Sequence, residues 1–168
     1  MEKGKFYLFK MMGWKTPIGG VVELIGTEWI LIKHIVVDYA LDGYSLLQKK
    51  YIKSYIQDDS VLFTEQVLLA KGIMDIRIPY DIPLNTQTAP FTWLKEHSIT
   101  VQFNPKDSSI CYVGKVGNMT QRFFELISMD PKGCWDTYFY KYTYATMRVI
   151  DIDCDYVNSL FIYNQKTL

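Results

Sequence analysis

The sequence predicts a mainly β protein with a few short helices, built as two small antiparallel barrels in tandem. Aromatic residues make up 15% of the 168 residues, and aromatic and β-branched side chains favour the half-buried surfaces of strands. Short apolar stretches, separated by glycine, proline and acidic turns, fill the first third of the chain without a helical stretch between them. The second half then repeats the order of stretches and turns seen in the first.

Five strands are expected in the first barrel. The apolar or alternating stretches that predict them are 5–10, 21–25, 29–37, 44–47 and 51–56. Asp42-Gly43 is a dipeptide typical of tight turns, and it is expected to precede the fourth strand. Five consecutive short strands without an intervening helix indicate a small, strongly bent antiparallel barrel.

Two short helices are expected in the middle of the chain. Thr64 is a suitable cap for a helix through Lys71, and Gly72 stands where a helix ends. The stretch 79–90 has three prolines and is the best linker, and a second helix is expected over 91–96, with Thr88 and Pro90 at its start. These boundaries predict a first barrel module with its helix over 1–72, a linker over 73–97 and a second barrel module over 98–168.

A shift of 94 residues aligns the two halves. It brings Gly20 onto Gly114, Val22 onto Val116, 28–30 onto 122–124, Asp42 onto Asp136, Tyr44 onto Tyr138 and Asp59 onto Asp153. Identity is sparse, but the order of elements agrees, which predicts an internal duplication. The last stretch, 155–165, is expected to form a closing helix with Tyr156, Leu160 and Tyr163 on one face.

Composition narrows the function classes. The 18 basic and 18 acidic residues balance, whereas a dedicated nucleic-acid binder usually carries a clear positive excess. The N-terminal stretch lacks the apolar segment of a signal peptide, and no stretch is apolar enough to span a membrane. Cys111, Cys134 and Cys154 are odd in number and widely spaced, as expected of reduced thiols, so a cytoplasmic protein is predicted.

Two long runs carry a family resemblance. The run 19–52 begins with a glycine-led strand, and the run 111–153 contains the turn Gly133-Cys134-Trp135 and a segment, 145–149, that loosely matches an I-T-x-I strand. In these features the chain resembles an uncharacterised bacterial family with tandem Sm-like (SH3-like) small β-barrel repeats. The resemblance implies the fold and carries no activity.

RNA-binding Sm proteins resemble the same architecture, so their contact motifs are the relevant comparison. They use an Asp-x-x-Met-Asn-like loop and a later Arg-Gly or Lys-His element. This chain has 35–40 (Ile-Val-Val-Asp-Tyr-Ala) at the first place and neither pair at the second. The family's RNA-contacting residues are therefore not carried over, and RNA binding rests on analogy of fold.

No catalytic constellation is evident. His34 follows Lys33 in an expected strand, and His97 ends an expected helix, where a cationic side chain suits the helix dipole. Asp151, Asp153 and Asp155 alternate and so share one face if they lie on a strand, as a hard cation would require. A strand end leading into a helix, with Asp155 at the cap, explains them more simply. We therefore predict no catalytic residue, no metal, no cofactor and no enzyme activity.

Two surfaces are candidate binding sites. Tyr138, Tyr140, Tyr142 and Tyr144 alternate and form a ladder on one face if they share a strand; this ladder either recognises a partner or packs against a neighbouring element. Lys49, Lys50 and Lys53 lie near two tyrosines; they either contact a polyanion or protect an edge strand.

The expected function is that of a non-enzymatic protein-interaction module, with an immunity or accessory factor as one role of that kind. The alternative is RNA or nucleic-acid binding through an Sm-like barrel surface. The expected partner is a protein, with no membrane association. A monomer or dimer is favoured over a ring, because a tandem pair can satisfy one strand edge internally.

Overall fold

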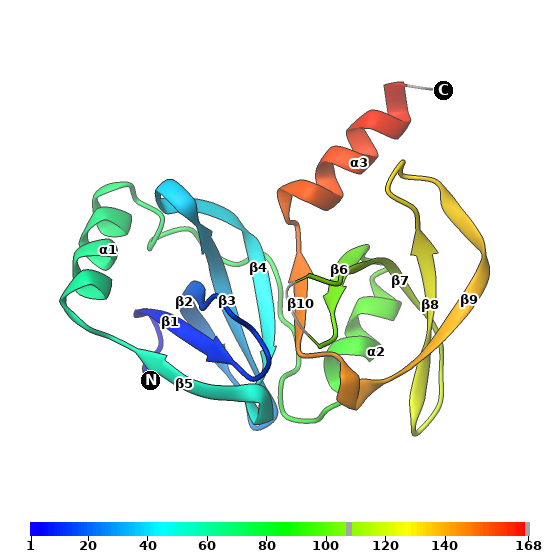
Figure 1. Cartoon of the computed structure of the whole chain (residues 1–168), viewed down its shortest axis with the longest axis horizontal. Coiled ribbons are helices and arrows are strands. Elements are labelled where there is room, and N and C mark those ends of the chain that lie inside the picture. The colour runs from blue at the N-terminus through cyan, green and yellow to red at the C-terminus, as the bar shows by residue number, and fades with distance from the viewer. Residues whose placement is uncertain (107–108, 167–168) are drawn as a thin grey trace.

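The computed structural model describes residues 1–106 and 109–166. Within these residues, ten strands form one antiparallel sheet in the order β5-β1-β2-β3-β4-β10-β6-β7-β8-β9, accompanied by three helices (Figure 1). A mainly β fold with short helices is therefore confirmed. The strands are β1 (Phe6–Met11), β2 (Ile18–Ile25), β3 (Trp29–Val36), β4 (Ala40–Gln48), β5 (Ile52–Ile56), β6 (Val101–Asn104), β7 (Tyr112–Met119), β8 (Phe123–Met129), β9 (Trp135–Thr143) and β10 (Val149–Ile152). The helices are α1 (Asp59–Ala70), α2 (Ala89–Glu96) and α3 (Asp155–Lys166).

The second five strands repeat the order of the first five. The order β5-β1-β2-β3-β4 is followed by β10-β6-β7-β8-β9, and a single 3₁₀ turn joins the last two strands of each half, at Lys49–Tyr51 and Tyr144–Thr146. Strand β4 pairs with β10 through residues Tyr44–Leu47, which joins the halves into one sheet. The sheet is not closed as a barrel, so the two expected barrels stay a prediction.

Gly20 of the first half and Gly114 of the second half are each crowded by equivalent residues of the neighbouring strand. A Cβ atom on Gly20 would stand 2.4 Å from Ile32 Cδ1 and 2.9 Å from the carbonyl oxygen of Lys33. A Cβ atom on Gly114 would stand 2.9 Å from Leu126 Cδ1 and 2.2 Å from the carbonyl oxygen of Ile127. The 94-residue shift thus relates each glycine and also the two residues that crowd it.

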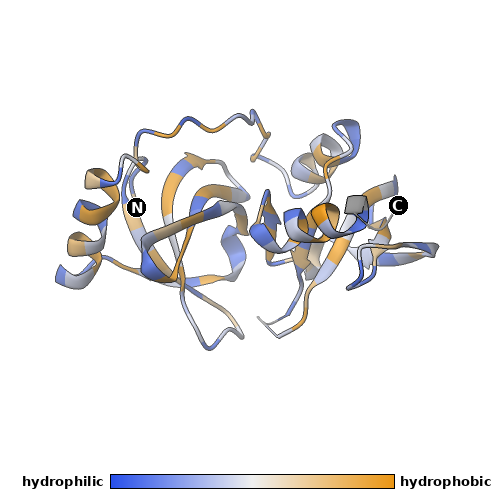
Figure 2. Ribbon diagram, turned by 90° about the horizontal axis from the view of Figure 1, so that it is seen from above, coloured by the Kyte–Doolittle hydropathy of each residue, from blue (hydrophilic) through white to orange (hydrophobic). Residues whose placement is uncertain are grey.

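The largest core cluster joins both halves to α2. Phe91 of α2 is fully buried, and its ring contacts Trp29 of the first half at 6.0 Å between centroids. It also contacts Phe124 at 4.7 Å and Tyr144 at 5.0 Å, both in the second half. The extended linker that runs from α1 to α2 (Figure 2) contributes Leu84, whose carbonyl oxygen accepts hydrogen bonds from the N–H groups of residues 28 and 29. Smaller apolar clusters lie between α1 and the first half and between α3 and the second.

Several element boundaries differ from the sequence-based expectation. Asp42 and Gly43 lie inside β4, and the turn before it falls at residues 37–39, where Asp38 (φ 60°) and Tyr39 (φ 58°) adopt left-handed conformations. Gly43 is required by packing, because a Cβ atom there would stand 2.3 Å from the carbonyl oxygen of Ile152. Gly43 therefore does not form a hairpin turn; it allows β10 to approach β4 closely.

The helices also differ in detail. Helix α1 starts five residues before the expected cap, because Asp58 caps it by accepting a hydrogen bond from the Val61 N–H at 3.1 Å. Gly72 follows its end with φ 71°, as expected. On α3 the expected apolar face is wrong: Val157 and Leu160 are buried, whereas Tyr156 and Tyr163 are exposed. None of the helices in the described part of the chain is long and apolar enough to cross a membrane.

Candidate functional site

Strand β9 is the most exposed strand of the second half. It pairs with β8 along one side, and no other described strand pairs with its second side (Figure 1). Trp135, Tyr138, Phe139 and Tyr140 are 40%, 74%, 61% and 47% exposed. Several exposed aromatic side chains on a strand with a free edge are a feature of interaction sites. We call these four residues the β9 surface.

The predicted tyrosine ladder has three members on β9 instead of four. Tyr140 and Tyr142 are register partners of Leu126 and Phe124, so both rings project from the face that carries the core. Tyr144 lies beyond the strand, in the 3₁₀ turn, where it is buried and donates a hydrogen bond to the Thr120 carbonyl oxygen at 2.7 Å. The ladder therefore runs from an exposed ring at Tyr138 to a core residue at Tyr144.

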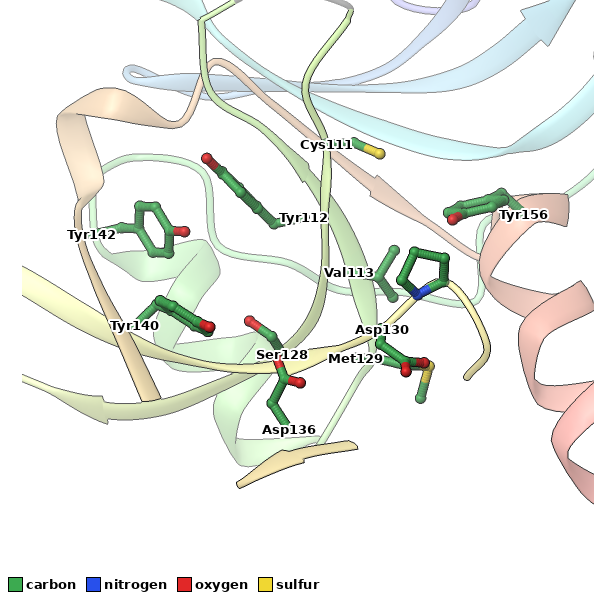
Figure 3. A pocket seen from close by; sticks show the side chains of 11 residues that line it. Cys111, Tyr112, Val113, Ser128, Met129, Asp130, Asp136, Tyr140, Tyr142 and Tyr156 are labelled. Carbon is green, nitrogen blue, oxygen red and sulfur yellow. The ribbon is translucent and has the colours of Figure 1, made fainter. Parts of the chain in front are cut away.

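The middle of this ladder, Tyr140 and Tyr142, lines a cavity of about 400 Å³, here called the tyrosine pocket. It is lined by Cys111, Tyr112, Val113, Ser128, Met129, Asp130, Pro131, Asp136, Tyr140, Tyr142 and Tyr156. Figure 3 shows the rings of Tyr112, Tyr140 and Tyr142 on one side of β7 and Tyr156 reaching in from α3 on the other. The volume lies in the range of small-ligand sites, which are mostly apolar with a few polar groups.

The charged groups that line the tyrosine pocket are both carboxylates. Asp130 is fixed by its turn, because its Oδ1 accepts hydrogen bonds from the N–H groups of Lys132 (2.8 Å) and Cys134 (2.9 Å). Asp136 lies at the start of β9 and is partly buried. The lining residues include no lysine, arginine or histidine. The cavity is therefore acidic as well as aromatic.

The Tyr142 phenol and the Cys111 thiol of this pocket are neutral near pH 7. Burial, followed by the charge of and hydrogen bond with Tyr112, raises the pKa of Tyr142 to about 12. Burial also raises the pKa of the Cys111 thiol, and the nearby Asp151 carboxylate adds to the effect. A neutral thiol is a poor nucleophile, so the lining offers hydrogen bonds and ring faces and no activated nucleophile.

A second cavity, of about 500 Å³, lies where the two halves meet and shares Tyr112 and Tyr142 with the first. We call it the junction pocket; its lining is Tyr51, Pro105, Lys106, Tyr112, Tyr142, Ala145, Thr146 and Arg148. The Arg148 guanidinium lies over the Tyr51 ring at 4.7 Å and donates to the Met12 carbonyl oxygen. The Arg148 guanidinium thus already makes a ring contact and a hydrogen bond within the fold.

The predicted lysine cluster is divided in the structure. Lys49 Nζ donates to the Gly26 carbonyl oxygen at 3.0 Å, which holds the 3₁₀ turn against the β2–β3 loop. Lys50 Nζ lies 5.1 Å from the centre of the Tyr51 ring, and Lys53 lies on the edge strand β5. None of the three lysines lines the junction pocket; their neighbour Tyr51 does.

The three alternating aspartates do not form one face. Asp151 lies within β10 and is buried in the sheet. Asp153 follows the end of β10 with φ 56°, and Asp155 is the first residue of α3. The cap-like contact is made by Asp42, whose Oδ1 accepts from the Asp155 N–H at 2.6 Å. In residues 1–106 and 109–166, no three His, Cys, Asp or Glu side chains come together as a metal site.

Asp151 belongs to a buried polar network where the halves join. Its carboxylate accepts hydrogen bonds from Ser45 Oγ (2.5 Å), Asn104 Nδ2 (2.6 Å) and Gln102 Nε2 (3.2 Å). Burial raises the pKa of Asp151, an effect that the charge of His34 partly opposes. Ser45 comes from β4 and the other donors from β6, so this network links the two halves across β10.

The two histidines lie apart from the tyrosine pocket. His97 ends α2, as predicted, with its Nδ1 2.8 Å from the Trp93 carbonyl oxygen and its ring stacked on Trp93 at 4.2 Å. His34 lies on β3 and lines a different cavity, next to α1. Neither imidazole is positioned to activate Cys111 or Ser128.

Of the residues that line the tyrosine pocket, sequence reasoning proposed only Tyr140 and Tyr142 as binding residues; it missed, among others, Tyr112, Tyr156, Asp130 and Asp136. Tyr112 lies on β7, Tyr156 on α3, and the aspartates in and after the β8–β9 turn. The 94-residue shift places Asp136 at a turn-like position, which gave no sign of a pocket. Only the curvature of the second half brings these segments together.

Comparison with known proteins gives no further assignment: no family model, no curated protein and no solved structure matches this chain.

Proposed function

We propose that this protein is a non-enzymatic protein-interaction module whose β9 surface receives an extended segment of a protein partner. The observation that carries the proposal is a free strand edge flanked by exposed aromatic side chains on both faces. Tyr138 and Tyr140 lie on one face of β9 and Phe139 lies on the other, while Trp135 lies beyond the irregular pairing at the start of the strand. Aromatic residues are enriched at protein interfaces, and an exposed edge offers main-chain hydrogen bonds to an added strand.

The opposite edge of the sheet supports the choice of β9. Strand β5 carries Lys53 and Ser54, and its pairing with β1 is interrupted by an irregularity at Lys10 and Met11. Charge and irregular pairing both discourage addition of a further strand. Strand β9 also has an irregular pairing, at Ile127 and Met129, and carries Lys141, so what distinguishes its edge is the set of exposed aromatic side chains.

The proposal includes the finer fold expected from sequence. Each five-stranded half would be one Sm-like module, 1–72 and 98–168, joined by 73–97 in a cytoplasmic bacterial protein. The repeated strand order and the matched environments of Gly20 and Gly114 support a duplication.

A nucleic acid is the second candidate ligand, favoured by one observation: the junction pocket combines Lys106 and Arg148 with three tyrosine rings. Such basic and aromatic groups bind single strands through phosphate contacts and base stacking. Binding of this kind weakens steeply with salt because counterions are released.

The deciding experiment is affinity capture from a lysate of the source organism with three baits. These are the wild-type protein, Phe139→Lys on β9 and Phe63→Lys on α1, the matched control, since Phe63 is likewise exposed. We expect a specific protein to be retained by the wild type and by Phe63→Lys and lost with Phe139→Lys. Equal retention by all three baits, or recovery of nucleic acid alone that elutes with salt, contradicts the proposal.

A further inference from the structure

We propose that the tyrosine pocket binds the guanidinium group of an arginine side chain presented by the partner. This inference rests on the proposed function and adds to it the chemistry of the residue that anchors the partner. It follows from three properties of the pocket: its rings, its charge and its position beside β9.

The rings provide the faces that a flat cation requires. Tyr112 and Tyr142 contact each other at 5.0 Å between centroids, and Tyr140 and Tyr156 are 47% and 44% exposed. The π electrons of each ring give its face the partial negative charge that attracts a cation. Among protein cations, the planar guanidinium stacks best on aromatic rings.

The carboxylates provide the opposite charge. Asp136 forms no hydrogen bond or ion pair with another residue in the described part of the chain, and Asp130 uses Oδ1 alone in its turn. A guanidinium donates up to five hydrogen bonds in a fixed planar pattern, so it can serve a carboxylate, the Ser128 hydroxyl and a phenol together. Two lysines of the neighbouring strands contact rings outside the pocket: Lys115 lies over Trp135 at 5.3 Å, and Lys141 lies over Phe123 at 5.2 Å.

The position of the pocket connects it to the strand edge. Tyr140, Tyr142 and Asp136 belong to β9 and also line the pocket (Figure 3). Alternate side chains of a strand paired with β9 would project on the same face as Tyr140 and Tyr142. An arginine at one of these alternate positions would then meet the rings and the carboxylates.

The test uses two small probes that differ in charge and little in shape: N-acetyl-arginine methylamide and N-acetyl-citrulline methylamide. The protein is labelled with ring-¹³C tyrosine, and the shifts of the 13 tyrosines are followed by NMR during titration. We expect the arginine probe to shift Tyr140, Tyr142 and Tyr156 with millimolar affinity, and to leave Tyr55, an equally exposed ring on β5, unchanged. We expect the citrulline probe to bind at least about threefold more weakly.

Variants separate the pocket from general charge effects. Asp136→Asn should weaken binding of the arginine probe by about threefold or more, whereas Asp59→Asn, at the start of α1, should leave it unchanged. Equal shifts with both probes, or shifts unaffected by Asp136→Asn, overturn the inference. If the arginine probe fails while Phe139→Lys still loses the captured protein, the inference fails and the proposed function stands. If the probe binds but the three baits retain the same proteins, the pocket stands and the proposed function fails.

Discussion

Replacement of Asp151 by alanine should destabilise the fold more than any other single change in the polar network. Asp151 is 6% exposed and accepts three hydrogen bonds, from Ser45, Asn104 and Gln102. Its removal leaves the Ser45 and Asn104 donors facing a cavity, whereas Gln102 keeps its hydrogen bond to Asn104. Each buried unsatisfied donor costs about 1–3 kcal/mol. Allowing for partial rearrangement, the expected loss in the free energy of unfolding is about 3–5 kcal/mol.

The Ser45→Ala variant tests how this loss is divided. It removes one hydrogen bond to the carboxylate, for which a loss of about 1.5–3 kcal/mol is expected. The double variant should lose less than the sum of the single losses, because both changes remove the same contact. Exact additivity would mean that the 2.5 Å contact between Ser45 Oγ and Asp151 contributes no coupling energy.

The pH dependence has a definite sign. Burial raises the pKa of Asp151 in the folded protein above its ordinary value of 3.8, so the folded state holds this proton more tightly than the unfolded chain. The stabilisation from the bound proton is complete below the unfolded pKa and is lost as pH rises through the folded pKa. Asp151→Asn has no proton to lose, so its stability relative to wild type should improve as pH rises above 3.8.

Urea unfolding followed by circular dichroism measures these free energies, at several values between about pH 4 and pH 8. An Asp151→Ala loss below about 1.5 kcal/mol would refute the reasoning about buried donors. A relative stability of Asp151→Asn that falls as pH rises would refute the sign. It would mean that the three donors favour the ionised carboxylate by more than burial disfavours it.

Three further predictions concern packing and cysteine reactivity. Phe91→Ala should lose about 3–5 kcal/mol in urea unfolding, because its ring is fully buried between both halves; a loss below about 1 kcal/mol would contradict this. Gly114→Ala should cost about 1–3 kcal/mol or more in the same assay, since its Cβ would stand 2.2 Å from the Ile127 carbonyl oxygen; an unchanged midpoint would show that β8 moves freely. In the folded protein, Cys134 should react with a thiol reagent while Cys154 reacts only after unfolding, because burial raises the Cys154 pKa to about 11 and leaves its side chain 3% exposed; equal rates would contradict the packing under α3.

The sequence predicted the strands well because their signals are local. Alternating or continuous apolar stretches placed β1 and β3 to within one residue, and Gly72 placed the end of α1. Pro90 and Thr88 likewise placed the start of α2 to within about two residues. These features depend on neighbours along the chain, where sequence patterns are informative.

Features that depend on distant segments were not predicted. Gly43 has a left-handed backbone and follows an aspartate, as a tight turn would, yet it serves the approach of β10, more than 100 residues away. Tyr156 and Tyr163 flank Leu160 at helical spacing, but Val157 and Leu160 face the sheet, because Val113 and Met129 lie beneath them. Pattern alone does not show which face of a helix the sheet will cover.

The contrast between the two free edges bears most directly on function. Pairing of β4 with β10 joins the fourth strand of one half to the fifth strand of the other, and β9 and β5 are the corresponding strands left over. Pairing of these edges between copies would extend the sheet without limit, a hazard that folded proteins suppress at one edge or both. Both edge strands carry a lysine and have an irregular pairing with their neighbour, but β9 also exposes four aromatic side chains. These shared features discourage both edges from pairing between copies, and the aromatic side chains of β9 favour that edge as the site that binds a foreign strand.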